Sequence, residues 1–296
     1  MGVFRSLVFA PANHARRVEK AFTLGADAVI LDLEDACAVS EKVSSRPKVV
    51  QALSLPRTCL GYARINPLST PYAYGDMVEI VAPGLDGIVL PKVEAPEDLL
   101  TVDWLLSQLE RDRGLPAGGV DVIPIIETAA GMSRLGEILR ATPRVKRASF
   151  GAGDFTLDLG LAWSRDENEL LVHRSQMVLQ SRAAGIEPPL DTVWVRLKDP
   201  EGFAASTERA HGLGFQGKLC IHPDQVDVVN RMFTPSDAQV AQARRVVEAF
   251  AQAEAEGSSA IQLDGQFIDY PIVYGAQRIL ELADKLARNA PASPMK

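Results

Sequence analysis

The sequence has few of the features that mark several common classes of protein. Only three cysteines are present, Cys37, Cys59 and Cys220, too few and too widely spaced for a disulfide framework or a cysteine metal cluster. No run of about 18 apolar residues occurs, so no membrane-spanning helix is expected. No signal-peptide layout opens the chain, and together with the cysteine usage this makes the cytoplasm the expected compartment.

Positive charge and histidine are also scarce. The 31 Lys and Arg residues are outnumbered by 38 Asp and Glu, which argues against a general binder of nucleic acid or of membrane surfaces. The four histidines show no metal-ligand spacing, so a zinc site is not expected. Hydrophobic residues make up 47% of the chain, enough for a large core, and this excludes intrinsic disorder.

What the sequence does contain is eight short apolar runs that alternate with segments of helical period. Several runs are almost continuously apolar, which is typical of parallel strands buried on both faces. The alternation predicts an α/β fold, a (β/α)8 TIM-type barrel, with a doubly wound open sheet as the alternative. The predicted strands are Ser6–Ala10, Ala28–Leu33, Leu60–Ile65, Gly87–Pro91, Val122–Ile126, Arg147–Phe150, Thr192–Leu197 and Lys218–Ile221.

The remaining sequence predicts an extension after the barrel. We expect the barrel to occupy residues 1–233, and residues 234–296 to form a helix–hairpin–helix lid that contacts a neighbouring subunit. Thr234, followed by proline at the first helical position, predicts the capped start of the first helix. The turn pair Asp264-Gly265 between alternating apolar residues predicts a hairpin over Ile261–Ile268.

Two carboxylates at the ends of neighbouring strands suggest a metal site. Glu127 follows the fifth predicted strand, and Asp154 follows the sixth within Gly-Ala-Gly-Asp. Active sites of such barrels lie at the C-terminal ends of the strands, and adjacent strands are about 4.8 Å apart. The two side chains can therefore share a hard cation such as Mg²⁺, which keeps waters and takes other ligands from the substrate. The alternative is that each carboxylate caps the helix behind it.

Arg64 leaves the third predicted strand and can serve the same site. A guanidinium at the barrel mouth suits recognition of a carboxylate or stabilisation of a developing oxyanion. The alternative is a structural salt bridge with Glu34 or Asp35, which follow the second strand. Lys92, after the fourth strand, is expected among the residues that support this site.

Two further groups have both a functional and a structural interpretation. Arg16 and Lys20 lie one helical turn apart after the first strand and suit the phosphates of a nucleotide-like ligand, or form a solvated helix face. Asp269 either starts the last helix or, as an acid on a mobile arm, is delivered to a neighbouring active site as a base.

Stretches over nearly the whole chain resemble the citrate lyase beta subunit-like CoA-ester lyases of the HpcH/HpaI aldolase superfamily. The stretch Gly-Ala-Asp-Ala-Val-Ile-Leu-Asp-Leu-Glu-Asp-Ala is the most distinctive. The matching segments are Arg5–Pro11, Gly25–Ala36, Arg64–Asn66, Leu90–Glu94, Glu127–Gly131, Gly151–Phe155, Asp199–Gly202, Ile221–Pro223 and Ile268–Pro271.

The resemblance implies a TIM-type barrel that forms a trimer or a multiple of one, with Mg²⁺, or Mn²⁺ as an alternative, at its mouth. It implies that Glu127 and Asp154 are the metal ligands and that Arg64 binds substrate near the metal. It also implies that a C-terminal lid offers Asp269 to an adjacent subunit. The positions that match contacts to the substrate or its CoA are Phe9, Arg16, Lys20, Ile221 and His222.

The activity implied is cleavage of a 3-hydroxyacyl-CoA thioester, of the malyl-CoA or citramalyl-CoA type, to acetyl-CoA and a 2-oxo acid. One alternative is a citrate lyase beta subunit that acts on a carrier-protein thioester. A second is a metal-dependent aldolase acting on a free hydroxy-keto acid, and a third is a barrel that binds without turnover. The acyl group and the choice between trimer and hexamer stay open.

Overall fold

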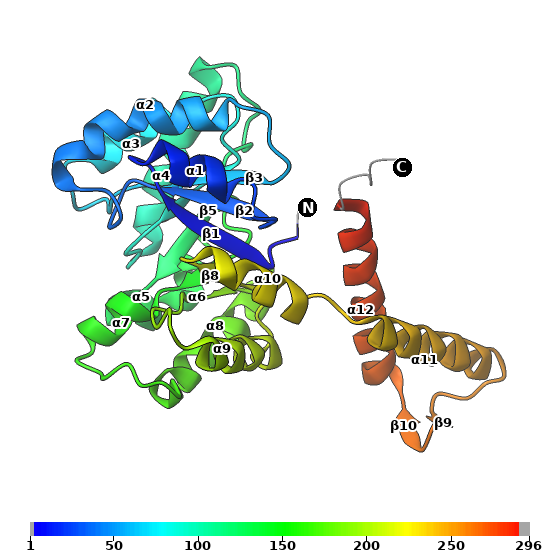
Figure 1. Ribbon diagram of the computed structural model, residues 1–296. Helices are drawn as coiled ribbons and strands as arrows, with labels where there is room; N and C mark the ends of the chain where they lie inside the picture. The colour runs from blue at the N-terminus through cyan, green and yellow to red at the C-terminus, as the bar shows by residue number, and fades with distance from the viewer. Residues whose placement is uncertain (1–2, 290–296) are drawn as a thin grey trace. The chain divides into compact units, whose positions relative to one another are not determined.

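The chain folds into two compact units in the computed structural model, which describes residues 3–289 (Figure 1). The larger unit spans Phe4–Asn230, and the smaller takes in the chain from Arg231. Each unit has a hydrophobic core of its own. Within residues 3–289, no helix combines the length and the apolar character that crossing a bilayer requires.

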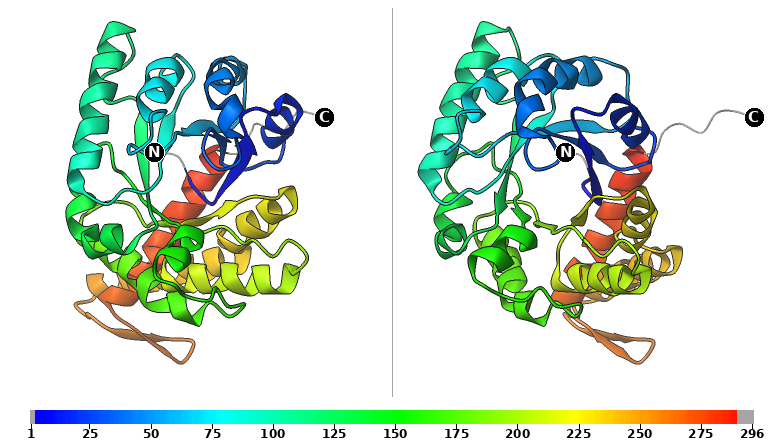
Figure 2. Two further views of the ribbon diagram at one scale, coloured as in Figure 1. Left: turned by 90° about the vertical axis from the view of Figure 1, so that its left-hand side faces the viewer. Right: turned by 60° about the vertical axis from the view of Figure 1, so that its left-hand side comes forward.

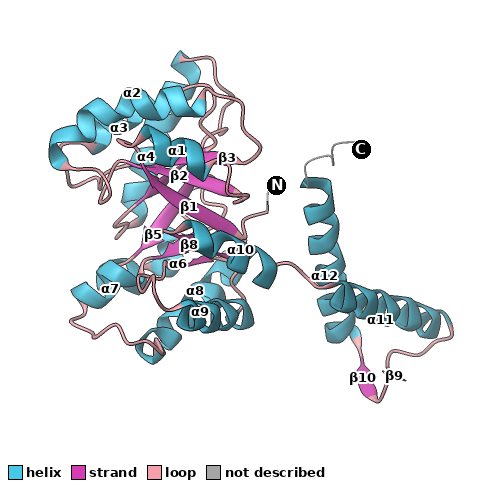
Figure 3. Cartoon of the chain, viewed as in Figure 1, coloured by secondary structure: helices cyan, strands magenta, loops and turns pink. Residues whose placement is uncertain are grey.

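The larger unit is a closed barrel of eight parallel strands in sequence order, with β8 hydrogen-bonded to β1 (Figure 3). The predicted TIM-type barrel is therefore confirmed, and the open-sheet alternative is wrong. The strands are β1 (Ser6–Pro11), β2 (Ala28–Asp32), β3 (Leu60–Arg64), β4 (Gly87–Leu90), β5 (Asp121–Ile126), β6 (Ser149–Phe150), β7 (Leu190–Asp191) and β8 (Gly217–Cys220).

Helices surround the ring of strands, as Figure 2 shows from two directions. Most connect one strand to the next, which is the βαβ arrangement that a parallel sheet requires. The α-helices are α1 (Ala15–Ala21), α2 (Lys42–Leu53), α3 (Ala73–Ile80), α4 (Pro96–Asp112), α5 (Ala129–Ser133), α6 (Leu135–Ile138), α7 (Ala152–Asp158), α8 (Leu171–Ala183), α9 (Pro200–Leu213) and α10 (Pro223–Met232). Short 3₁₀ turns, η1 (Val39–Glu41) and η2 (Asn168–Leu170), precede α2 and α8.

The barrel interior is filled by apolar side chains from alternate positions of the strands. Side chains alternate between the two faces of a strand, so one set points inward and the other faces the helices. The interior cluster takes members from seven of the strands, and all are almost completely buried. These residues are Phe4, Leu7, Ala28, Ile30, Tyr62, Val89, Ile123, Ile125, Leu190 and Leu219.

The seventh strand is the one that the sequence places wrongly. An alternating run predicts it over Thr192–Leu197, but β7 ends at Asp191. Directly after this point the Thr192 hydroxyl accepts a hydrogen bond from the backbone N–H of Ala152 (2.9 Å), and the chain leaves the sheet. The rest of the run lies outside the sheet, with Trp194 buried and Leu197 55% exposed.

The smaller unit is a helix, a hairpin and a second helix, namely α11 (Asp237–Ala255), β9 (Ile261–Leu263), β10 (Gln266–Ile268) and α12 (Tyr270–Asn289). Asp264 (φ 51°) and Gly265 (φ 80°) form the two-residue turn, and both occupy the left-handed region that such a tight hairpin turn requires. Its core comprises Ala243, Val246, Phe250, Ile268, Val273 and Ala276.

The start of α11 differs from the prediction. Thr234 does not cap it. Ser236 does, because its hydroxyl accepts from the Gln239 N–H (3.2 Å) while the Gln239 side chain accepts from the Ser236 N–H (2.8 Å). This reciprocal pair satisfies both donors, so the helix begins two residues later than the Thr-Pro pattern indicates.

Candidate metal and substrate site

The barrel register places charged side chains just beyond the interior core. Asp32, Arg64 and Glu127 each lie two residues after a member of the interior cluster, which are Ile30, Tyr62 and Ile125. Since side chains alternate along a strand, all three point toward the barrel axis at the C-terminal ends of β2, β3 and β5. This is the end at which barrel enzymes build their active sites.

Glu127 is a buried carboxylate of the site, with 5% of its surface exposed. Its Oε1 accepts a hydrogen bond from the backbone N–H of Lys92 (2.8 Å). Burial raises the pKa of Glu127 to about 8, and the nearby negative charges of Glu34 and Asp154 contribute to this shift. The carboxylate therefore lies where a positive charge would be favourable.

Lys92 contacts both predicted metal ligands. Its backbone bonds Glu127, while its Nζ lies 3.2 Å from Oδ2 of Asp154, in the first turn of α7. The φ of Lys92 is 52°, an unusual backbone conformation for a non-glycine residue, and such strain is common at functional sites. Lys92 thus contacts Glu127 through its backbone and Asp154 through its side chain.

Gly151 makes room for the Glu127 carboxylate. A Cβ built on Gly151 would lie 2.5 Å from Oε2 and 2.6 Å from Cβ of Glu127, closer than real contacts allow. The first glycine of the Gly-Ala-Gly-Asp stretch is therefore needed, because it lets the turn after β6 approach the end of β5 closely.

We expect Gly151→Ala to weaken Mg²⁺ binding, because the added methyl displaces the Glu127 carboxylate. Displacing a ligand should cost at least about tenfold in affinity, since losing a group that only supports a ligand already costs 10–100-fold. Isothermal titration of the purified variant measures this. Gly212→Ala, in α9 with nothing within 4 Å of the new methyl, is the matched control and should bind like the wild type. Wild-type affinity in Gly151→Ala would show that this close approach is not required.

The donor set fits a magnesium-type cation. Among the described residues no three or more His, Cys, Asp or Glu side chains are grouped to hold a metal. Two carboxylates are what Mg²⁺ ordinarily takes from a protein, its remaining ligands being waters and substrate oxygens. Glu127 and Asp154 would be the residues to hold such an ion, and the raised pKa of Glu127 reflects burial and a negative environment that a cation would relieve.

Arg64 is held by acidic partners on the neighbouring strand. Its Nε and Nη2 donate to the two oxygens of Asp32 at 2.8 and 2.6 Å, and its Nη1 lies 2.9 Å from Oε2 of Glu34. The exposed carboxylate of Asp35 is farther, at 3.7 Å. These carboxylates raise the pKa of Arg64 against the effect of burial, so the guanidinium stays charged. Its Cζ lies 4.8 Å from the centre of the Phe9 ring.

The salt bridge with Glu34 that the sequence offered as an alternative for Arg64 is present, but the strongest partner is Asp32, which sequence reasoning missed. Asp32 also accepts from the backbone N–H groups of Glu34 (2.9 Å) and Ala36 (3.1 Å). Burial raises the pKa of Glu34 to about 7 even though Arg64 opposes the shift. Arg64 thus forms the salt bridge of the structural alternative. The same bonds fix the direction of its guanidinium, and a role in substrate binding also requires a fixed direction.

A buried lysine supports the loops that carry these residues. Lys42 Nζ donates to the carbonyl oxygens of Leu33 (3.0 Å) and Glu34 (2.8 Å) and to Oδ1 of Asn66 (2.6 Å). Asn66 in turn donates to Asp76 (2.7 Å). Sequence reasoning missed Lys42 because its bond to Asn66 joins residues 24 apart along the chain, and no local sequence pattern indicates such a bond.

The remaining predicted residues belong to three elements of the chain. Arg16 and Lys20 are exposed on α1, directly after β1. Ile221 and His222 follow β8, where both backbone N–H groups donate to Oε1 of Gln225 (2.8 and 3.2 Å). Asp269 belongs to the smaller unit, where its Oδ1 accepts from the Ile272 N–H (3.5 Å) at the start of α12.

A closed (β/α)8 barrel with acidic and basic side chains collected at the C-terminal strand ends has the architecture of a barrel enzyme. Comparison with known proteins gives the family. The model of the HpcH/HpaI aldolase/citrate lyase family matches residues 5–223, and the chain belongs to this family.

Similar proteins include citrate lyase beta subunits and malyl-CoA lyases. The chain is 36% identical to the citrate lyase subunit beta of Leuconostoc mesenteroides subsp. cremoris, over 95% of this chain and 93% of the relative. It is 34% identical to the L-malyl-CoA/beta-methylmalyl-CoA lyase of Cereibacter sphaeroides, over 96% and 95%. Among solved structures, CitE of Mycobacterium tuberculosis in complex with magnesium, acetoacetate and coenzyme A is similar, with a TM-score of 0.77 and 30% identity over 95% of this chain and 98% of that one.

Proposed function

We propose that this protein is a Mg²⁺-dependent carbon–carbon lyase that cleaves a 3-hydroxyacyl-CoA thioester of the malyl-CoA or citramalyl-CoA type to acetyl-CoA and a 2-oxo acid. The observation that carries the proposal is the convergence of Glu127 and Asp154 on Lys92, beside the charged Arg64. The similarity to a malyl-CoA lyase and to a structure holding magnesium and coenzyme A supports it. Mn²⁺ is the natural substitute for Mg²⁺ in such an oxygen-ligand site.

In this proposal Glu127 and Asp154 hold the cation, which acts when bound as a Lewis acid toward substrate oxygens. Arg64, kept charged and directed by Asp32 and Glu34, stabilises negative charge on the departing enolate. The substrate hydroxyl gives its proton to solvent water and its oxygen becomes the carbonyl of the 2-oxo acid. The bond between its carbon and the adjacent methylene breaks, and that electron pair passes to the acetyl-CoA enolate. Asp269 then protonates the enolate carbon, and in the reverse direction it removes that proton from acetyl-CoA.

The proposed binding residues divide between the acyl group and the CoA. Phe9 lies against Arg64, and Ile221 and His222 follow β8, so these suit the substrate near the reacting atoms. Arg16 and Lys20 on α1 suit the CoA phosphates. The chain acts as a homo-oligomer, a trimer or a multiple of one, in which the lid of one subunit offers Asp269 to its neighbour.

Charge reversal at Arg16 and Lys20 tests the CoA assignment. We expect the double variant Arg16→Glu, Lys20→Glu to raise the KM for a CoA ester by about tenfold or more, since two reversals each cost about 1 kcal/mol of attraction to phosphate. The effect should shrink at high salt. Arg111→Glu, on the exposed face of α4, is the matched control. An unchanged KM would favour an aldolase acting on a free hydroxy-keto acid.

A second candidate is a citrate lyase beta subunit that acts on a carrier-protein thioester, favoured by the 36% identity to the Leuconostoc subunit. A panel of CoA thioesters, assayed with and without Mg²⁺ for acetyl-CoA release, separates the two. We expect release from malyl- or citramalyl-CoA only with the metal. No release from any free CoA ester, together with copurification of an acyl-carrier protein, would support the second candidate instead.

A further inference from the structure

The segment between α7 and α8 returns to the turn that carries Asp154. Trp163 lies in this segment, and a Cβ built on Gly153 would be 3.8 Å from its Cζ3, an ordinary van der Waals contact. Gly153 immediately precedes Asp154 in the first turn of α7. The edge of the indole therefore lies close enough to Gly153 to leave room for no more than a methyl group between it and the turn that presents one of the two proposed metal ligands.

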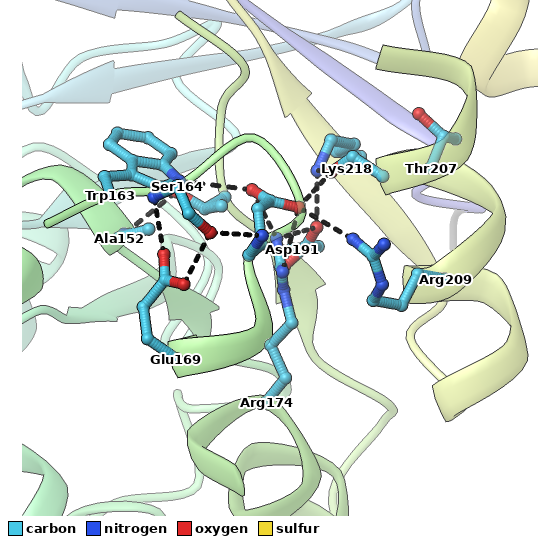
Figure 4. Close-up of polar contacts among 12 residues, drawn as sticks. Ala152, Trp163, Ser164, Glu169, Arg174, Asp191, Thr207, Arg209 and Lys218 are labelled. Carbon is cyan, nitrogen blue, oxygen red and sulfur yellow. Dashed lines mark hydrogen bonds and ion pairs between the residues drawn. The ribbon is translucent and has the colours of Figure 1, made fainter. Parts of the chain in front are cut away.

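Trp163 is itself fixed at two points. Its Nε1 donates to Oε1 of Glu167 (3.3 Å), and its carbonyl oxygen accepts from the Arg196 guanidinium. Figure 4 shows Trp163 and Ser164 beside the polar contacts of Arg174, Asp191 and Lys218. Ser164 adds a further tie, because its hydroxyl donates to Glu169 (2.7 Å) and accepts from the Glu167 N–H (2.9 Å). The indole thus belongs to a segment that these hydrogen bonds hold in place beside the α7 turn.

Glu167 is held by a cluster of buried charges between the barrel wall and the helices. Its two oxygens accept from the Arg174 guanidinium (3.0 and 3.1 Å), and Oε2 also accepts from the Ser206 hydroxyl (2.7 Å). Arg174 continues to Asp191 of β7 (2.8 Å), and Asp191 pairs with Lys218 of β8. The side chains of the four charged residues in this cluster have no exposed surface.

A cluster of this kind is a costly way to stabilise a fold. Apolar side chains of similar volume often do as well as a buried ion pair, so a positional role for the charges is a reasonable hypothesis. Arg174 and Lys218 keep the pKa of Asp191 low although burial opposes this, so that carboxylate is charged. Glu167 also has a left-handed backbone (φ 53°), which a non-glycine residue adopts at an energetic cost.

We infer that Glu167 is a positioning residue for the metal site, acting through Trp163 to hold the α7 turn that carries Asp154. The inference rests on the proposed role of Asp154 as a metal ligand. It also explains why these charged side chains are buried. They connect β7, β8 and α8 to a loop residue, so that the Asp154 carboxylate is presented by a rigid part of the barrel.

Magnesium affinity in a double-mutant cycle tests the inference. Trp163→Ala, Glu167→Gln and the double variant are titrated with Mg²⁺ by calorimetry, with Trp104→Ala as the matched control, a tryptophan on α4 that is 65% exposed. We expect each single variant to lose affinity by about tenfold, the lower end of the effect of removing a supporting group. The double variant should lose no more than the larger single loss, because both act in one chain of contacts. The control should bind like the wild type.

Amide hydrogen exchange in the metal-free protein gives a second readout. Exchange at residues 153–156 should be faster in Trp163→Ala than in the wild type or in Trp104→Ala, while the circular dichroism spectra stay the same. Because Trp163 is only half-buried, this variant keeps the test valid even where Glu167→Gln fails to fold. Wild-type affinity and wild-type exchange in Trp163→Ala would overturn the inference and leave the proposed function intact. A wild-type protein that binds no Mg²⁺ would instead overturn the metal site on which both depend.

Discussion

Glu127→Gln should remove Mg²⁺ binding and turnover together. The amide is almost the same size as the carboxylate and its oxygen can still accept from the Lys92 N–H, so the local structure should persist. It lacks the negative charge that a hard cation requires. We expect Mg²⁺ affinity to fall by at least about 100-fold, the upper end of what is lost with a residue that merely supports a metal ligand.

Two further measurements make this result specific. The unfolding midpoint of metal-free Glu127→Gln should equal or exceed that of the wild type, because burial already disfavours the charged form of Glu127, as its raised pKa of about 8 shows. Glu97→Gln, whose side chain is 70% exposed on α4, should bind and turn over normally. Wild-type Mg²⁺ affinity in Glu127→Gln would remove this residue from the metal site.

Asp269→Asn should abolish cleavage while leaving CoA-ester binding nearly intact. The amide cannot give a proton to the enolate carbon, and loss of a general acid typically costs 10²–10⁴-fold, so we expect kcat to fall by about 1,000-fold. Solvent-deuterium exchange into the methyl group of acetyl-CoA, followed by NMR, should be lost with it. Affinity for the CoA ester, measured by titration, should stay within about twofold, since Asp269 acts on a proton rather than on binding.

Asp264→Asn is the matched control for this experiment. Asp264 occupies the hairpin turn of the same unit, where asparagine adopts the left-handed conformation (φ 51°) readily. It pairs with Arg245 at an exposed position (2.6 Å), so its loss should cost little. Normal turnover in Asp269→Asn would show that the carboxylate does no more than start α12.

The barrel could be predicted because its signals are local. Continuously apolar runs such as Ala-Val-Ile-Leu at 28–31 are typical of the buried strands of a parallel sheet. The Asp-Gly pair at 264–265 is typical of a tight hairpin turn. The end of β7 was not predictable in this way. An alternating run at 192–197 is compatible with a strand, but the sheet ends at Asp191, where the next residue, Thr192, bonds Ala152 across 40 residues of the chain.

The site shows the same division. Glu127, Asp154 and Arg64 stand at strand ends, so their position in the sequence already predicts a shared location. The interactions that hold these three side chains in place do not follow from their positions in the sequence. The pairing of Arg64 with Asp32, the left-handed Lys92 and the Glu167–Arg174–Asp191 cluster depend on which side chains face one another after the barrel closes. Sequence spacing contains no such information, because these partners lie on different strands and helices.

A crystal of the protein grown with Mn²⁺ in place of Mg²⁺ tests the central claim most directly, since anomalous scattering locates the ion. The account predicts a single peak at the C-terminal ends of β5 and β6, bonded to one oxygen of Glu127 and one of Asp154. A peak bonded to only one of these carboxylates, or separate ions at the two, would contradict it.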